Sequence, residues 1–220
     1  AKLLSHVARS REFGIHSASA EFDFGEVMER VQQVIRDIEP HDSIERYSGL
    51  GVDVVQGEAR ITSPWTVEVN GTTIRSRNIV VATGGRPFVP PIEGLERIDY
   101  YTSDTLWEMR KKPEKMVVLG GGPIGCELTQ AFTRLGVQVT QIEMLPRLLL
   151  REDVEISALV QDKFVAEGVE VLTGHAAKRF FRRDGQNYVV AEAESGSVEI
   201  EFDALIVAVG LATAETPRLL

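Results

Sequence analysis

Cysteine is nearly absent from this sequence, and a long apolar run is missing altogether. The single cysteine excludes an internal disulfide and a thiolate zinc cluster, and the four histidines are scattered without metal-ligand spacing, so we expect no metal site. No stretch approaches the roughly twenty apolar residues that cross a bilayer. The amino terminus has no basic region followed by an apolar secretory core, so we expect a cytoplasmic protein.

Positive charge is also in deficit. The 220 residues carry 24 Lys and Arg against 33 Asp and Glu, a formal net charge of −9. This balance disfavours approach to nucleic acid or to an anionic membrane, and we expect neither as a partner. The hydrophobic content of 43% is ordinary, so the chain has enough apolar residues for one large or two small folded domains.

A glycine-rich turn is the most informative motif that is present. The apolar run 116–119 suits a buried parallel strand, and it leads into Gly120, Gly121, Gly122, Pro123, Ile124, Gly125, Cys126 and Glu127. Such glycines let the backbone turn into a helix whose first amides face a pyrophosphate. We expect Gly120 to make the turn, Gly122 to let phosphate approach, and Gly125 to let the helix pack closely on the strand. Pro123 suits a first helical turn.

The acidic partner of this motif is Glu143. A helix with apolar residues at 124, 128, 132 and 135 and a cap at Gly136 leads to a second strand that Glu143 ends. There the carboxylate would accept hydrogen bonds from both adenosine ribose hydroxyls and repel a 2′-phosphate. We predict NAD(H), favoured over NADP, with Arg147 softening the discrimination. The plain alternative is that the glycines mark an ordinary loop, but the strand, helix and acid around them favour nucleotide binding.

Cys126 has two interpretations. A cysteine beside a helix amino terminus can have a lowered pKa and be reactive. A small side chain directly after the third glycine also packs well in a core, and free cysteine is usually buried. We expect core packing.

Two pieces are expected along the chain, joined by the proline-rich segment 86–95. In the first, Asp23 caps a helix that Pro40 stops, and its apolar stripe is expected to be core. Strands are expected at 52–55, 66–69, 72–74 and 79–82, with a hairpin turn at Asn70-Gly71. In the second, a helix at 154–167, a strand at 169–172, a meander over 177–202 and a strand at 204–209 follow the glycine turn. The expected class is α/β: a Rossmann-like NAD-binding domain, a parallel sheet with an inserted β-meander, plus a partial FAD-binding domain.

Three segments together give a family resemblance: Gly120 to Glu127, residues 82–87, and Ala208-Val209-Gly210. With them the chain resembles the pyridine nucleotide-disulfide oxidoreductases over nearly its whole length. Segments 38–43, 102–107 and 121–128 are most similar to mercuric-reductase-like members, with dihydrolipoamide dehydrogenase as a second possibility. The resemblance implies FAD and NAD(P)H in two related domains, with hydride passing from nicotinamide to flavin and electrons then passing to a cysteine pair.

The resemblance also implies roles for particular residues. Near FAD it places Ala82, Thr83 and Gly84, and beside the adenine it places the backbone of Gly57 and Ala59; the plain alternatives are a strand end and a turn. Glu127 is the expected catalytic position, beside the flavin face where hydride arrives, against the alternative of a carboxylate that stabilises the helix start. Gly210 is expected near the nicotinamide half and the Ala177 backbone near adenosine.

Departures from the family pattern indicate a fragment. The flavin-binding glycine turn and the cysteine pair are expected upstream of Ala1, the lysine partner of Glu127 is missing, and Leu211 replaces an arginine. The second flavin motif and a dimerisation domain are expected after Leu220. We expect residues 1–103 to form a partial FAD-binding domain with its linker and residues 104–220 to form the NAD(H)-binding domain.

Two hypotheses of function follow. In the first, the chain is part of a homodimeric enzyme that passes electrons from NADH through FAD to a disulfide, a metal ion or another small-molecule acceptor. In the second, it is a stand-alone module that senses NADH without turnover.

Overall fold

The computed structural model describes residues 1–213. The chain divides into two compact units, one formed by Ala1–Arg30 with Pro87–Leu211 and one that contains Val31–Arg86. Residues 1–30 and 87–103 therefore belong to the same unit as the glycine turn. The expected boundary at residue 103 separates the residues expected to bind FAD from those expected to bind NAD(H), and it stays a prediction.

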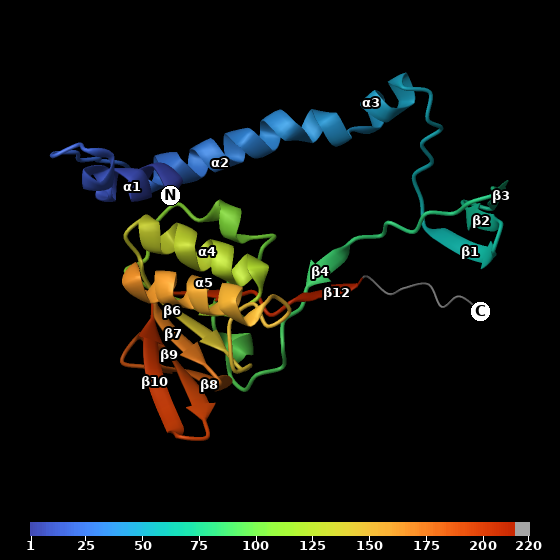
Figure 1. Cartoon of the computed structure of the whole chain (residues 1–220). Coiled ribbons are helices and arrows are strands. Elements are labelled where there is room, and N and C mark those ends of the chain that lie inside the picture. Colours follow the sequence, from blue (N-terminus) through green and yellow to red (C-terminus); the bar gives the residue numbers. More distant parts are fainter. Residues whose placement is uncertain (214–220) are drawn as a thin grey trace. The chain divides into compact units, whose positions relative to one another are not determined.

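A four-stranded parallel sheet forms the centre of the first unit (Figure 1). The strand order is β11-β5-β6-β7, so the order in space differs from the order in the chain, as in doubly wound sheets. The strands are β5 (Lys115–Leu119), β6 (Gln138–Glu143), β7 (Glu170–Thr173) and β11 (Ala204–Val207). This confirms the expected Rossmann-like fold.

Two helices connect these strands on one face of the sheet (Figure 1). They are α4 (Pro123–Arg134) and α5 (Val154–Ala166), each followed by a left-handed glycine, Gly136 and Gly168. The guanidinium of Arg134 donates two hydrogen bonds, of 2.9 and 2.8 Å, to the carboxylate of Glu167. This pairing lowers the pKa of Glu167 and ties the carboxyl ends of the two helices together.

The other face of the sheet is covered by an antiparallel meander. Its strands are β8 (Ala176–Arg183), β9 (Gln186–Ala193) and β10 (Gly196–Phe202). Asp184 and Gly185 join β8 to β9 with φ of 53° and 83°, the left-handed pair that a two-residue hairpin turn needs. The inserted meander is therefore as predicted.

Alternating side chains of β5 supply two cores. Met116 and Val118 pack with the helices, whereas Val117 and Leu119 pack with the meander. The meander core also contains Phe180, Val189, Ala191, Ile200 and Phe202. The unit is thus a three-layer arrangement of helices, parallel sheet and meander.

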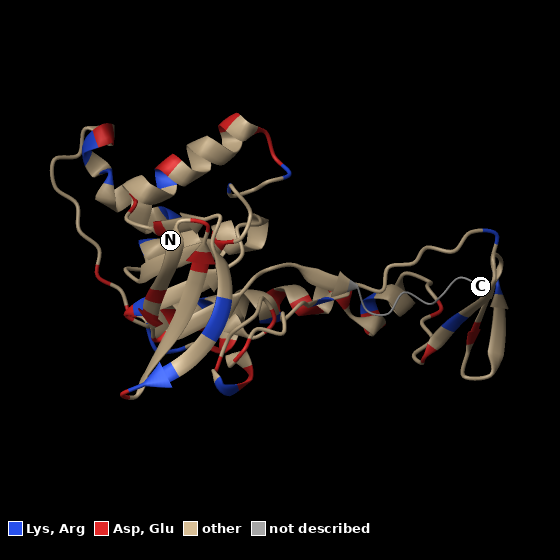
Figure 2. Cartoon of the chain, turned by 90° about the horizontal axis from the view of Figure 1, so that it is seen from below, with Lys and Arg blue, Asp and Glu red and all other residues tan. Residues whose placement is uncertain are grey.

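Charges on the meander are paired rather than gathered on one basic face. Figure 2 shows basic and acidic segments side by side along these strands. The Lys115 ammonium lies 2.7 Å from the carboxylate of Glu201, and the Arg183 guanidinium lies 3.0 Å from that of Glu199. This mixture fits the even distribution of charge in the sequence.

Helix α2, which begins in the first unit, is capped as predicted. The Asp23 carboxylate accepts a 2.9 Å hydrogen bond from the Glu26 amide at the start of α2 (Phe24–Ile38). The other short elements of this unit are α1 (Lys2–Ala8), η1 (Ser10–Phe13), η3 (Leu95–Arg97) and η4 (Leu106–Glu108). Among the helices of residues 1–213, none is both long enough and apolar enough to cross a membrane.

The expected core stripe of α2 is correct only in its first half. Phe24 and Met28 are buried in the helix-side core. Val34, Ile35 and Ile38 are 36%, 42% and 52% exposed, because no described element packs over them. Helical periodicity marks one face of a helix, but it does not tell whether a partner covers that face.

The second unit contains a small antiparallel sheet. Its elements are η2 (Glu39–Asp42), α3 (Ile44–Gly49), β1 (Ala59–Ser63), β2 (Thr66–Val69) and β3 (Thr72–Arg75). Asn70 and Gly71 have φ of 51° and 74°, so the predicted hairpin turn between β2 and β3 is confirmed.

Two expected strands are wrong. Residues 52–55 and 79–82 form no strand, and Val80 is 88% exposed. An apolar run becomes a strand only where a neighbouring strand accepts its backbone hydrogen bonds, and none among residues 1–213 does so. Two short segments, β4 (Gly85–Pro87) and β12 (Leu211–Thr213), instead pair with each other.

Candidate nucleotide-binding site

The glycine turn lies where the carboxyl ends of three parallel strands meet. The Gly120 amide, directly after β5, donates a 2.8 Å hydrogen bond to Ile142 on β6. The Ala208 amide, directly after β11, donates a 2.8 Å hydrogen bond to Leu119 on β5. The turn therefore lies at the edge of the sheet where ligands bind in open α/β folds.

Close packing explains the first and third glycines. Gly120 has a φ of 106°, and a Cβ atom there would overlap the carbonyl oxygen of Ala208 and lie 2.8 Å from its carbon. At Gly125 a Cβ atom would overlap the carbonyl oxygen of Gly120 and lie 3.0 Å from its carbon. The turn and the close approach of helix to strand are thus both as expected.

Gly122 differs from these two, because a Cβ atom there would meet no heavy atom within 4 Å. It is the residue before α4, with φ of −76° and ψ of 179°, and Pro123 is the first helical residue. The amides of Ile124 and Gly125 belong to the first turn, where no intrahelical acceptor exists. Open space beside these donors fits a pyrophosphate.

Glu143 is bonded to the turn itself. One carboxylate oxygen accepts a hydrogen bond of 2.5 Å from the Gly121 amide, and the other accepts one of 2.7 Å from the Leu145 amide. The side chain is 9% exposed. Each carboxylate oxygen can accept more than one hydrogen bond, so Glu143 has acceptor capacity left for ribose hydroxyls. The carboxylate thus both holds the turn and presents negative charge beside it.

Arg147 is committed to its own loop. Its guanidinium donates hydrogen bonds of 2.7 Å to the Leu150 carbonyl and 2.9 Å to the Glu152 carbonyl. To contact a 2′-phosphate it would have to give up these bonds. The softening of NAD selectivity expected from Arg147 therefore has no support in this geometry.

Sequence analysis missed the loop that closes over the glycine turn. The Leu149 amide donates a 2.7 Å hydrogen bond to the Gly121 carbonyl, with Leu149 itself at a φ of 48°. Leu148 is fully buried, and its carbonyl accepts a 2.5 Å hydrogen bond from the Ser157 hydroxyl. The available signal was three successive leucines outside a helix pattern, since apolar loop residues need a surface to pack on.

Cys126 is buried, as expected, in a small core with Leu148, Phe164 and Val169. Burial raises the pKa of its thiol. We predict that Ellman's reagent labels less than about one-tenth of the thiol in the native chain at pH 7.5, because a buried, neutral thiol is a poor nucleophile. Full labelling in denaturant is the control, and rapid stoichiometric labelling of the folded chain would contradict core packing.

The other predicted residues of this unit lie near the same sheet edge or on its covering layers. Glu127 is exposed on α4, and its carboxylate has no hydrogen-bond or ion-pair partner within residues 1–213. Gly210 follows β11, and its carbonyl accepts a 2.9 Å hydrogen bond from the Phe88 amide. Ala177 is half-buried on β8, opposite Ala191. The roles expected for these three residues stay predictions.

The residues expected near FAD lie in the second unit. Gly57 is covered by the side-chain amide of Asn70, which donates a 2.8 Å hydrogen bond to the Gln56 carbonyl. Ala59 begins β1 opposite Val69. Ala82, Thr83 and Gly84 are exposed and outside the strands. The structure thus ties the Gly57 turn to a hairpin, and no other element within residues 1–213 covers residues 82–84.

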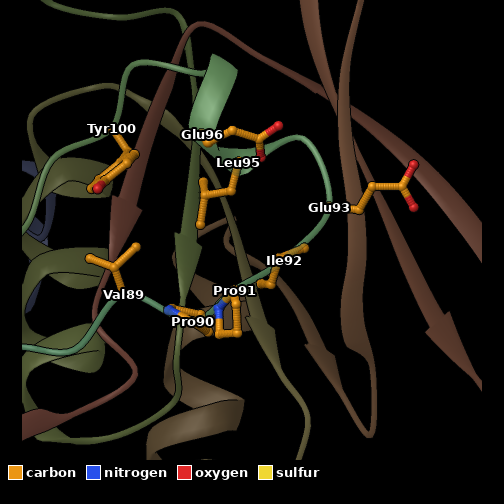
Figure 3. A pocket seen from close by; sticks show the side chains of 8 residues that line it. All are labelled: Val89, Pro90, Pro91, Ile92, Glu93, Leu95, Glu96 and Tyr100. Atoms are coloured by element: carbon orange, nitrogen blue, oxygen red, sulfur yellow. The ribbon is translucent and has the colours of Figure 1, made fainter.

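A separate cavity of about 410 Å³ lies along the connecting segment of the first unit. Its walls include Val89, Leu95 and Tyr100, and Glu93 directs its carboxylate away from them (Figure 3). It shares no lining residue with the glycine turn. Across residues 1–213, histidine, cysteine and carboxylate side chains form no cluster suited to a metal ion.

Comparisons with known proteins agree with this architecture. The sequence profile described as pyridine nucleotide-disulphide oxidoreductase matches residues 4–217. A mercuric reductase of Lysinibacillus sphaericus is 33% identical over 207 residues, which cover 93% of this chain and 38% of that protein. A dihydrolipoyl dehydrogenase of Acholeplasma laidlawii is 30% identical over 215 residues, 96% of this chain and 62% of that protein.

A solved structure shows the same likeness. The HOCl-induced flavoprotein disulfide reductase RclA from Escherichia coli, as a Cu(II) complex, has a TM-score of 0.74 at 25% identity. The match covers 98% of this chain and 47% of RclA, so the chain spans about half of that protein. On the profile match and on relatives of at least 30% identity, the chain belongs to the pyridine nucleotide-disulphide oxidoreductase family.

Proposed function

We propose that this chain supplies the NADH site of an FAD-dependent oxidoreductase. In the whole protein, NADH would reduce the flavin, and electrons would pass on to a disulfide or a metal ion. The observation that carries the proposal is the glycine turn, with open space at Gly122 beside free helix amides and the Glu143 carboxylate next to it.

The chain's own residues would bind and orient the nucleotide. The first-turn amides of α4 would hold the pyrophosphate, and Glu143 would accept hydrogen bonds from the adenosine ribose. A 2′-phosphate would meet the carboxylate charge, so NADH is the proposed donor and NADPH the weaker ligand. The nicotinamide supplies hydride chemistry when bound. Glu127, exposed on the same helix, is the proposed catalytic carboxylate beside the reacting ring.

For the electron acceptor we propose only a chemical class. The relatives include proteins named mercuric reductase and dihydrolipoyl dehydrogenase, so both a metal ion and a disulfide are represented among them. None of the described residues distinguishes a metal-ion acceptor from a disulfide acceptor.

Titration of the 220-residue chain with NADH and with NADPH, followed by cofactor fluorescence, tests the binding proposal. We expect saturable NADH binding and NADPH binding at least about tenfold weaker, since a like charge beside the 2′-phosphate is unfavourable and about 1.4 kcal/mol corresponds to tenfold in affinity. Equal affinity for the two would remove Glu143 as the selecting group. No binding would overturn the proposal.

The enzyme and sensor hypotheses can be distinguished by an experiment on the whole protein that contains this chain. Addition of NADH without oxygen should bleach the flavin absorbance if hydride is transferred. Bound NADH with unchanged flavin absorbance would favour the sensor hypothesis.

A further inference from the structure

Gln141 is a fully buried polar residue to which the nucleotide-binding motif assigns no role. It lies on β6, two residues before Glu143, so both side chains lie on the helix-facing side of the sheet. Its side-chain amide nitrogen donates a 3.0 Å hydrogen bond to the Gly120 carbonyl and lies 3.7 Å from the Cys126 sulfur. Its side-chain oxygen has no hydrogen-bond partner among residues 1–213.

Gln141 and Glu143 act on the same peptide group. Gln141 donates to the carbonyl of the Gly120–Gly121 peptide, and Glu143 accepts from its amide at 2.5 Å. A peptide between two glycines rotates readily, because neither residue has a Cβ atom to restrict it. Two side chains of one strand therefore hold this peptide from both ends.

The next peptide is held as well. The Gly121 carbonyl accepts hydrogen bonds from the Leu149 amide at 2.7 Å and from the Cys126 thiol at 3.4 Å. In a trans peptide the N–H points away from the C=O, so the Gly122 amide faces the opposite side. A rotation of the Gly120–Gly121 peptide would therefore also change the direction of the Gly122 N–H.

We infer that Gln141 is a positioning residue for nucleotide binding: with Glu143 it clamps the Gly120–Gly121 peptide and so sets the direction of the amides offered to the pyrophosphate. This inference rests on the proposed NADH site. The unpaired side-chain oxygen of Gln141 supports the inference, because a buried residue kept only for stability gains nothing from an unpaired acceptor.

Gln141→Leu keeps the side-chain volume close to that of glutamine and removes the donor. We expect NADH to bind about five- to tenfold more weakly, the loss that one net hydrogen bond predicts. Urea unfolding should show a midpoint equal to or above that of the parent chain, since the unpaired oxygen is also removed. The matched control is Gln138→Leu, at an exposed position of the same strand, which should leave NADH affinity within twofold.

Amide hydrogen exchange by NMR, without nucleotide, separates the clamp from the binding proposal. Gly121 should exchange at least about fivefold faster in Gln141→Leu than in the parent chain, because its peptide loses the bond to Gln141. Unchanged Gly121 exchange together with unchanged NADH affinity would overturn the inference, as would lower stability with unchanged affinity. Faster Gly121 exchange in Gln141→Leu, together with no NADH binding by the parent chain, would leave the clamp standing and refute the proposed function instead.

Discussion

Replacing Gly125 by alanine is expected to lower the free energy of unfolding by about 3 kcal/mol and to abolish NADH binding. The added Cβ atom would overlap the Gly120 carbonyl oxygen, and it would lie 3.0 Å from the carbonyl carbon and 3.4 Å from the Gln141 amide nitrogen. The carbonyl cannot move aside without breaking its bond to Gln141. Helix α4 would have to move away from the strand, taking its first-turn amides with it.

Urea unfolding and NADH titration measure the two effects, and Gly122→Ala is the matched control. At Gly122 a Cβ atom meets no protein atom within 4 Å, and the backbone is extended rather than left-handed. The free energy of unfolding of Gly122→Ala should stay within about 0.5 kcal/mol of that of the parent chain. If phosphate approaches there, NADH affinity should still fall, by about tenfold or more. Gly125→Ala that unfolds at the same urea concentration as the parent would contradict the packing described above.

Replacing Glu143 by alanine is expected to weaken NADH binding about 100-fold. The substitution removes charge-assisted acceptors for the ribose, each of which contributes about 1.5–3 kcal/mol. It also leaves the amides of Gly121 and Leu145 without their present acceptor, so the turn loses one side of its clamp. NADPH should lose less affinity than NADH, because the repulsion of its 2′-phosphate is removed at the same time.

Paired titrations with the two nucleotides test this result. Glu170→Ala is the control, since Glu170 is an exposed carboxylate on the neighbouring strand β7. It should leave the ratio of the two affinities unchanged. A Glu143→Ala chain that keeps the parent's ratio of NADH to NADPH affinity would show that selectivity lies elsewhere.

Local patterns in the sequence were enough to predict the first unit's sheet and turns. The glycine spacing and the helix stripe after it each depend on residues close together in the chain. Such patterns report backbone geometry and one face of an element, which neighbouring residues largely determine. The alternation of strands with helices predicted a doubly wound parallel sheet, but the strand order β11-β5-β6-β7 became visible only in the structure.

Strand pairing and packing between residues far apart in the chain were not predictable in the same way. Residues 52–55 and 79–82 have the composition of strands, but pairing depends on a neighbour that the composition does not name. The exposed half of the α2 stripe is a similar case.

The contacts that hold the glycine turn also lay outside the motif. Gln141 is one of several polar residues on β6, so nothing in the pattern of that strand marks it, and its partner Gly120 is 21 residues away. Glu143 was predicted to bind ribose, whereas its bond to Gly121 became visible only in three dimensions.

The central claim is that the glycine turn at the carboxyl end of β5 holds the nucleotide. NMR titration of the ¹⁵N-labelled chain with NADH tests it most directly, because each backbone amide reports its own surroundings. We predict that the largest shift changes occur at Gly121, Gly122, Ile124 and Gly125, with smaller ones around Glu143. Saturable binding whose largest changes lie elsewhere, for example around the cavity at Val89 and Tyr100, would contradict the claim.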